Sequence, residues 1–222
     1  MADQKRPYRK KRRAELEEQT RLRITESTMQ LHGTLGPART SISAVAARAG
    51  VRRSTVYRHF PDEAALFAAC STHWMASNSP PDLAGWRTIK DPDQRLATAV
   101  GQLYAYYRAT APMLVNLHRD EAIMPIVKQL FAAFRGYLAA ARDTLMHGRQ
   151  LRGRPRQQVQ AAIGHALSFP TWHSLTHEQG LNDRQAADLM CRLVQAAAHS
   201  PDKRRRWESM PTPSHRASAA SD

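Results

Sequence analysis

Apolar residues recur three and four positions apart along most of the chain, and Ala, Leu, Arg and Gln fill many of the positions between them. This spacing places apolar side chains on one face of an α-helix. No segment alternates apolar and polar residues over the length of a strand, and no Asn-Gly or Asp-Gly pair marks a hairpin turn. The pattern therefore predicts an all-α fold.

Capping residues and the helix breakers Gly and Pro set the limits of the expected helices. Ser41, Asp62, Asp91 and Asn182 each stand where a side chain can cap the helix that follows. Pro170 lies inside one helical pattern and should kink it. The expected helices cover residues 14–32, 42–48, 53–59, 62–75, 92–108, 112–118, 121–147, 156–177 and 183–199.

The same signals divide the chain into four parts. Residues 1–13 are basic and have little to bury, so we expect a disordered arm, and the Ser-, Pro- and Arg-containing residues 200–222 should form a disordered tail. Residues 14–61 would form a three-helix unit, and residues 62–199 a second helical domain. Within the second domain, residues 76–92 contain three prolines and a glycine and are expected to be a linker.

Positive charge is concentrated in the first quarter of the chain. The 33 Lys and Arg residues outnumber the 19 Asp and Glu residues, for a net charge of +14. Residues 1–60 hold 14 basic and 5 acidic side chains, a net charge of +9, whereas residues 61–199 hold 14 and 11. This distribution indicates a polyanionic partner for the first unit alone. The alternative is that the charge only aids solubility.

Several protein classes are excluded by composition. No apolar run approaches the 18 residues of a membrane-spanning helix. The basic N-terminus is not followed by the apolar stretch of a secretory signal. The two cysteines, Cys70 and Cys191, form no CxxC or Cys/His cluster, which argues against a disulfide framework and a zinc finger. We therefore expect a cytoplasmic protein without a membrane partner.

Residues 41–60, SISAVAARAGVRRSTVYRHF, have the pattern of a helix-turn-helix. Ile42 and Val45 on the first helix and Val56 and Phe60 on the second would share one small core around a glycine-centred turn. A basic helical hairpin can also serve as a protein-contact surface, which is the alternative interpretation. The outer face of the second helix carries hydrogen-bonding side chains and no acid: Arg52, Arg53, Ser54, Thr55, Tyr57, Arg58 and His59.

Residues 21–67 resemble the DNA-binding domain of the TetR/AcrR family of transcriptional regulators. The family pattern has Thr or Ser, three residues, an aliphatic residue and Ala, then Ala-Gly-Val, a polar stretch, a Tyr and a Phe three residues later. It is met by Ser41, Val45, Ala46, Ala49, Gly50, Val51, Tyr57 and Phe60, with Leu66 following. The sequence departs from many members at Arg52 and Ser54, where Ser and Gly are common, and at Glu63, where Lys is common.

The resemblance implies that the second helix of the motif enters the major groove of double-stranded DNA. Arginine is well suited to guanine, and phosphate contacts position the helix without specifying sequence. The basic arm, residues 5–13, would follow phosphates or the minor groove, or else be a solvated tail. Base edges or adjacent phosphates are assigned to Arg52, Arg53, Ser54 and Thr55, and phosphates to Ser41, Tyr57 and His59, with Arg58 on the same face.

The resemblance also implies that the second domain senses a ligand and forms a homodimer. Aromatic residues there could line a cavity or could simply be core, and Tyr104, Phe131, Tyr137 and His165 belong to the same wider set. The residues favoured for the ligand site are Trp74, Tyr107, His118, Phe134, Phe169, Trp172 and His173.

Two apolar stripes could close a four-helix bundle between two copies of the chain, or could pack within one copy. A two-fold dimer would require a palindromic operator. The stripes are Leu189, Met190, Leu193, Val194 and Ala197 on the last helix and Ala162, Ala166 and Phe169 before it.

Together these features predict a homodimeric repressor that a small-molecule effector releases from its operator. A DNA-architectural protein without a ligand is the alternative. The chain has no Gly-rich phosphate loop, nucleophile elbow or metal-ligand set, so we expect neither an enzyme nor a cofactor. His173 and His177 lie four residues apart but lack a third ligand, so no metal site is expected.

Overall fold

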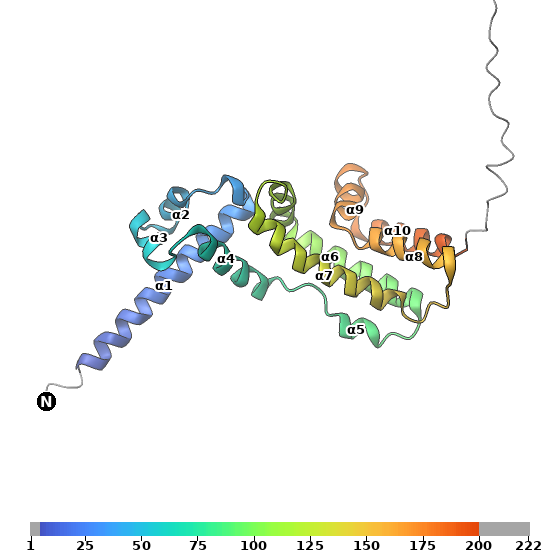
Figure 1. Cartoon of the computed structure of the whole chain (residues 1–222), viewed down its shortest axis with the longest axis horizontal. Helices are drawn as coiled ribbons and strands as arrows, with labels where there is room; N and C mark the ends of the chain where they lie inside the picture. The colour runs from blue at the N-terminus through green and yellow to red at the C-terminus, as the bar shows by residue number, and fades with distance from the viewer. Residues whose placement is uncertain (1–4, 200–222) are drawn as a thin grey trace, which may run out of the picture.

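The computed structural model describes residues 5–199, and the expected tail at 200–222 lies outside them, as do residues 1–4. The described chain folds into helices joined by short connections, which confirms the all-α prediction. A small N-terminal domain lies at one end of an elongated molecule and a larger helical body at the other (Figure 1). The helices are α1 Lys5–Thr34, α2 Ile42–Ala49, α3 Arg53–His59, α4 Glu63–Ser77, α5 Leu83–Arg87, α6 Pro92–Asp120, α7 Pro125–Met146, α8 Gly153–Ala166, α9 Phe169–His173 and α10 Asp183–Ala198, with short helical turns η1 Pro37–Arg39 and η2 Ser174–Glu178.

The four expected capping residues all cap helices. The side chains of Ser41, Asp62 and Asp91 accept hydrogen bonds from main-chain N–H groups in the first turns of α2, α4 and α6. Asn182 and Gln185 form a reciprocal capping box at the start of α10. Each cap satisfies a donor that the helix itself leaves without a partner, and so fixes where the helix begins.

The first helix is longer than the sequence pattern indicates. The expected disordered arm, residues 1–13, is wrong for residues 5–13, which are the first turns of α1. Pro7 lies in the first turn, where a missing N–H breaks no helical hydrogen bond. The residues that follow are mostly Arg, Lys, Glu and Leu, which favour helix, and Arg13 pairs with Glu17 at 3.2 Å one turn further on.

The expected linker at residues 76–92 contains a helix that the sequence analysis missed. In α5, the Trp86 side chain is only 1% exposed, and its indole N–H donates to Oε1 of Gln102 at 2.7 Å. Asp82 caps this helix by accepting from the N–H of Ala84. Burial of one large aromatic side chain therefore orders a segment whose composition alone favours a loop.

Two proline predictions are also wrong. The expected helices 92–108 and 112–118 are one continuous helix, α6, which passes through Pro112. Pro112 is exposed, whereas the neighbouring Met113 and Leu114 are buried, so packing on the inner side holds the helix together despite the lost hydrogen bond. Pro170 does not kink a helix. The chain breaks between α8 and α9, and Pro170 lies in the first turn of α9.

Three clusters of buried apolar side chains organise the molecule. The N-terminal cluster joins α1–α4 and includes Ile24, Val45, Val56 and Phe60. The largest cluster fills the body between α5, α6, α7, α8, α9 and α10. A third cluster packs Phe67 of α4 against α6 and α7, and so connects the N-terminal domain to the body.

A polar junction network, made by Asn116, Arg119 and Asp120 at the end of α6, also joins the two domains. The Asp120 carboxylate is 2% exposed and accepts hydrogen bonds from the N–H of Ala38 at 3.0 Å and from Nε of Arg119 at 2.8 Å. The Asn116 amide donates to the carbonyl oxygen of Gly33 at 2.9 Å. The end of α6 is therefore fixed to the end of α1 and to η1.

Candidate nucleic-acid interface

The segment from α2 to α3 has the geometry of a helix-turn-helix. Oγ of Ser41 accepts from the N–H of Ala44 at 3.2 Å and starts α2. Gly50 ends α2 in the left-handed conformation, with φ of 65°, which a glycine adopts without steric cost. Helix α3 then runs from Arg53 to His59, as the sequence predicts.

The outer surface of α3 presents the expected hydrogen-bonding side chains to solvent. Val56 and Phe60, on the opposite side, are each 1% exposed and anchor the helix in the N-terminal cluster. Among the described residues, the arginines of this surface form no ion pair. The exposed members are Arg52, Arg53, Ser54, Tyr57 and Arg58, and the half-buried members are Thr55 and His59.

His59 differs from the other side chains of this surface. Its Nε2 atom is buried without a hydrogen-bond partner among the described atoms. Burial, together with the positive charges of Arg58 and Arg21, lowers the pKa of His59, so the ring is neutral near pH 7. It therefore adds no positive charge to the surface.

Arg21 of α1 connects the first helix to the end of α3, a contact that the sequence analysis missed. Its Nη1 donates to the carbonyl oxygen of His59 at 3.0 Å, and its guanidinium lies 4.5 Å from the centre of the Phe60 ring. The arginine thus satisfies a carbonyl at the C-terminus of α3 and stacks on an aromatic face. Because the two residues are 38 positions apart, no local pattern indicates this contact.

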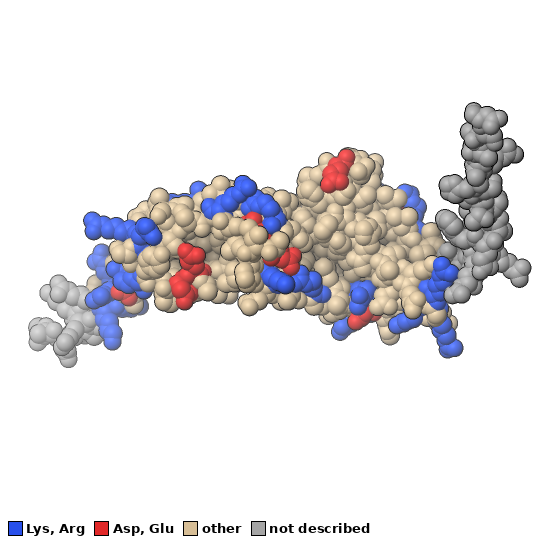
Figure 2. Space-filling view, turned by 45° about the horizontal axis from the view of Figure 1, so that its top comes forward, with Lys and Arg blue, Asp and Glu red and all other residues tan. Residues whose placement is uncertain are grey.

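Basic side chains gather around the N-terminal domain. Figure 2 shows Lys and Arg at the end of the molecule that holds α1–α3, and a second group at the far end of the body. Residues 10–19 of α1 are all exposed, and this stretch continues the helix away from the domain (Figure 1). The described part of the expected basic arm is therefore a projecting helix.

Comparison with known proteins identifies the N-terminal domain. The model of the family described as "Bacterial regulatory proteins, tetR family" matches residues 24–70, which span the end of α1, the helix-turn-helix and the first half of α4. Residues 24–70 therefore form a DNA-binding domain of the tetR type. This domain indicates a DNA-binding regulator. No curated protein sequence matches the chain.

Solved structures of regulator proteins share the fold over most of the chain. A TetR-like transcriptional regulator from Rhodococcus sp. RHA1 is 16% identical, with a TM-score of 0.62, over 82% of this chain and 97% of that one. A tetR-family regulator from Streptomyces coelicolor is 20% identical, with a TM-score of 0.54, over 82% and 80%. The fatty acid degradation regulator FadR from Bacillus halodurans is 16% identical, with a TM-score of 0.51, over 81% and 94%.

The helical body has a pocket of 120 Å³ between α4, α6 and α7. Of the residues favoured for the ligand site, Trp74 and Phe134 line it, as do Phe131 and Tyr137 of the wider set. Tyr106 lines it too and was missed, because a tyrosine beside the fully buried Tyr107 has no distinguishing sequence signal.

The five other favoured residues do not line this pocket but form an aromatic cluster further along the body. Tyr107 is fully buried, and its hydroxyl donates to the carbonyl oxygen of Leu167 at 2.6 Å. The His118 ring stacks on Phe169 at 5.0 Å. Trp172 lines a separate surface pocket beside Leu181. His173 stacks on His177 at 4.4 Å.

The expected dimerisation stripes are divided between the core and the surface. Met190 and Val194 are buried in the core of the body with Ala166 and Phe169, so the alternative of packing within one copy holds for these four. Leu193 is 49% exposed and Leu189 is half-buried. Part of the stripe on α10 is therefore free to contact a second copy.

Residues 5–199 include no helix with the length and apolar character of a membrane span. They also contain no group of three or more His, Cys, Asp or Glu side chains placed to hold a metal ion.

Proposed function

We propose that this protein is a homodimeric repressor that binds a palindromic operator in the cytoplasm and leaves it when a small-molecule effector binds. The outer surface of α3 carries the proposal. Its arginines are exposed and pair with no acid within residues 5–199, while the opposite side of the helix is buried in the N-terminal cluster. A helix held in this way can enter the major groove as a rigid unit.

The assignment of contacts follows the exposure of the side chains. We assign base edges and adjacent phosphates to Arg52, Arg53, Ser54 and Thr55, with Arg58 beside them. We assign phosphates to Ser41, Tyr57 and His59. Oγ of Ser41 accepts from Ala44, which leaves its hydroxyl hydrogen free to donate to a phosphate. The neutral His59 ring would contribute one hydrogen bond rather than a charge.

The projecting first turns of α1 are proposed to follow phosphates. Residues 5–13 contain seven Lys and Arg residues, and exposed Lys10–Arg13 have solvent around them rather than protein. If the dimer neutralises roughly 6–10 phosphates, the plot of log affinity against log salt concentration should have a slope of about −0.9 per phosphate. Removal of residues 1–13 should weaken binding to all sequences about equally and flatten this slope.

A two-fold dimer would use the outward side of α10 together with α8. Leu189 and Leu193 are the apolar side chains of α10 that remain accessible there. Two such subunits would present their α3 helices about 34–36 Å apart or somewhat more, one turn of B-DNA, which is why a palindromic operator is proposed.

The effector is proposed to bind the pocket between α4, α6 and α7. Its present volume of 120 Å³ is below the roughly 300 Å³ at which ligand pockets usually begin. A ligand must therefore widen it and displace the Trp74 end of α4. Leu66, near the other end of the same helix, packs in the N-terminal cluster. Movement of α4 would change the separation of the two α3 helices, with a coupling of about 1–3 kcal/mol.

Selection of bound sequences from random double-stranded DNA tests the proposal. The wild-type protein should enrich a palindrome, and Arg53→Ala should weaken binding to it by about tenfold or more and relax the preference at one position of each half-site. Arg87→Ala removes an exposed arginine from the body and is the matched control for charge.

Enrichment of no sequence, with salt-dependent binding to every fragment, would instead indicate an architectural DNA-binding protein. Binding with a flat salt response would contradict the proposed phosphate contacts. Once an effector is found, operator DNA must weaken effector binding by the same factor by which the effector weakens DNA binding, since the coupling is reciprocal.

A further inference from the structure

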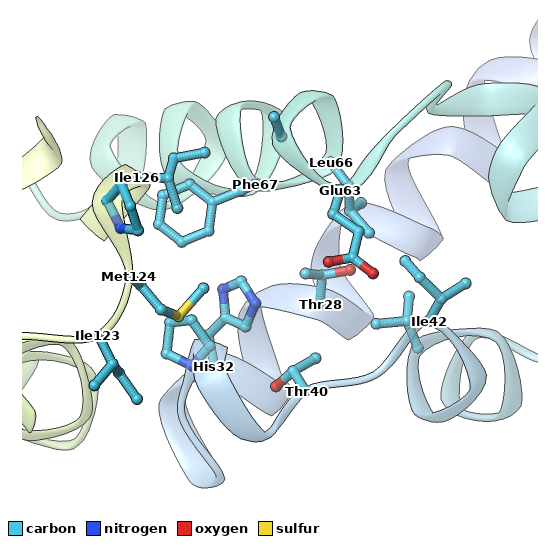
Figure 3. Close-up of a pocket in the computed structure, with 14 residues that line it drawn as sticks. Thr28, His32, Thr40, Ile42, Glu63, Leu66, Phe67, Ile123, Met124 and Ile126 are labelled. Atoms are coloured by element: carbon cyan, nitrogen blue, oxygen red, sulfur yellow. The ribbon is translucent and has the colours of Figure 1, made fainter. Parts of the chain in front are cut away.

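A second and larger pocket, of 460 Å³, lies where the N-terminal domain meets the body (Figure 3). Its walls come from α1, from α2 and the segment before it, from the first half of α4, and from the connection between α6 and α7 with the first turn of α7. It shares no lining residue with the 120 Å³ pocket described above. Its volume falls within the range of about 300–1,000 Å³ that small-molecule sites occupy.

The lining of this junction pocket is apolar apart from a few side chains, and its only charge is negative. Of the 14 residues that line it, none is Lys or Arg, although the chain contains 33 of them. Glu63 is the single acid, and within residues 5–199 it has no ion-pair partner. Figure 3 shows its carboxylate extending from α4 over the pocket, toward Thr28 and Ile42.

The remaining polar side chains of the pocket carry no positive charge that would repel a cation. His32 is 6% exposed, and the one hydrogen-bond contact of its ring among the described residues is that of Nδ1 with Sγ of Cys70, at 3.6 Å. Burial lowers the pKa of His32 to about 4, so the ring is neutral near pH 7. The hydroxyls of Thr28 and Thr40 already donate to main-chain oxygens.

Aromatic and sulfur-containing side chains complete the wall. The Phe67 ring lies 5.6 Å from that of His32, and both rings border the pocket beside Met124 (Figure 3). Aromatic faces attract cations, and Met adapts to irregular apolar ligands. The lining combines an unpaired carboxylate with an aromatic wall and contains no lysine or arginine. It is therefore suited to a ligand that is both apolar and positively charged.

We propose that the junction pocket binds an amphipathic organic cation, with its apolar part against Phe67 and Met124 and its charge beside Glu63. The occupant would touch α2 and α4 of the N-terminal domain, and residues 123–126, which follow the junction network and lead into α7. It would therefore lie between the DNA-binding unit and the body. The site does not depend on the effector pocket proposed above, and its test requires no DNA.

Isothermal titration calorimetry with two probes of the same shape and opposite charge tests this site. Tetraphenylphosphonium should bind the full-length protein with one site per chain, and tetraphenylborate should not compete with it. Glu63→Gln should weaken binding of the cation about three- to tenfold. Glu15→Gln makes the same charge change at an exposed position on α1 and should leave the affinity unchanged. Ala64→Trp places a large side chain in the lining and should abolish binding.

Several results would overturn the proposal. These are no binding of tetraphenylphosphonium at ~1 mM, equal affinity for the anion at the same site, or equal loss in Glu63→Gln and Glu15→Gln. Loss of cation binding in Phe134→Ala, with Glu63→Gln and Ala64→Trp unaffected, would place the cation in the other pocket. Circular dichroism and thermal unfolding of each variant establish that it is folded, so that lost binding reports on the site.

Discussion

Replacement of Asp120 by Asn should destabilise the protein through the junction network alone. The substitution keeps the shape of the side chain and one oxygen for the N–H of Ala38, which lies 3.0 Å from the carboxylate. It removes the charge and turns an acceptor into an NH₂ group that faces the donors of Arg119, whose Nε lies at 2.8 Å. A hydrogen bond between charged groups contributes about 1.5–3 kcal/mol. We expect a loss of this size, since the Asp120 site is 2% exposed and water cannot replace the lost partner.

Thermal unfolding followed by helical circular dichroism measures the effect. For a protein of this length, about 1.5–3 kcal/mol corresponds to a fall in Tm of roughly 3–12 °C. Protein concentration must be the same for all samples, because the proposed dimer would make Tm depend on concentration. Asp143→Asn is the matched control. The Asp143 side chain is 70% exposed and 3.6 Å from Arg142, so its loss should change stability by less than about 0.5 kcal/mol.

The pH dependence gives an independent check. Burial alone would raise the pKa of Asp120, but hydrogen bonds from Arg119 and Ala38 outweigh it and hold the pKa below its ordinary value. The carboxylate therefore contributes stability above that ordinary value, and the contribution is lost as pH falls through the lowered pKa. Wild type and Asp120→Asn should converge in strong acid. A Tm for Asp120→Asn equal to that of Asp143→Asn at pH 7 would refute the reasoning.

Three further changes should alter stability, as measured by urea unfolding. Gly36→Ala should lower the free energy of unfolding by about 2 kcal/mol or more, because Gly36 has φ of 92° and an added Cβ would lie 2.0 Å from Nη2 of Arg119. Gly85 has open space around it, so Gly85→Ala should be neutral or stabilising. Arg95→Met should cost about 3 kcal/mol, since this 3% exposed arginine donates to four main-chain carbonyl oxygens that would lose their partner. His32 should make the protein less stable below pH 6.5. Burial lowers its pKa in the folded protein to about 4, so the unfolded chain takes up the proton first as the pH falls. Between pH 7 and 5, the free energy of unfolding of the wild type should fall by about 2 kcal/mol more than that of His32→Asn.

The N-terminal domain could be predicted well because its limits are set by local signals. Ser41 and Asp62 each cap the helix that directly follows, and Gly50 supplies the left-handed turn between α2 and α3. These effects act over three or four residues and can be read from one sequence. The exposed and buried sides of α3 follow from the same short-range periodicity.

The errors arise where distant parts of the chain decide the outcome. Helix α5 is ordered because Trp86 is buried against α6, and α6 continues through Pro112 because its inner side is packed. In the body, core and pocket aromatic residues have the same sequence signature. Only the packing of α4 on α6 and α7 assigns Trp74 to the pocket and Tyr107 to the core.

Because α1 is continuous, the basic residues at its start have a fixed orientation relative to the N-terminal domain. Because the helix that projects into solvent is the one that packs Ile24 and Leu31 in the N-terminal domain, rotation of either part about the axis turns the other. Each α-helical residue adds about 100° of rotation and 1.5 Å of rise. One extra alanine after Thr20 would therefore swing the basic side chains around the axis by more than a quarter of a circle. Four extra alanines would return them close to their original orientation, about 6 Å further out.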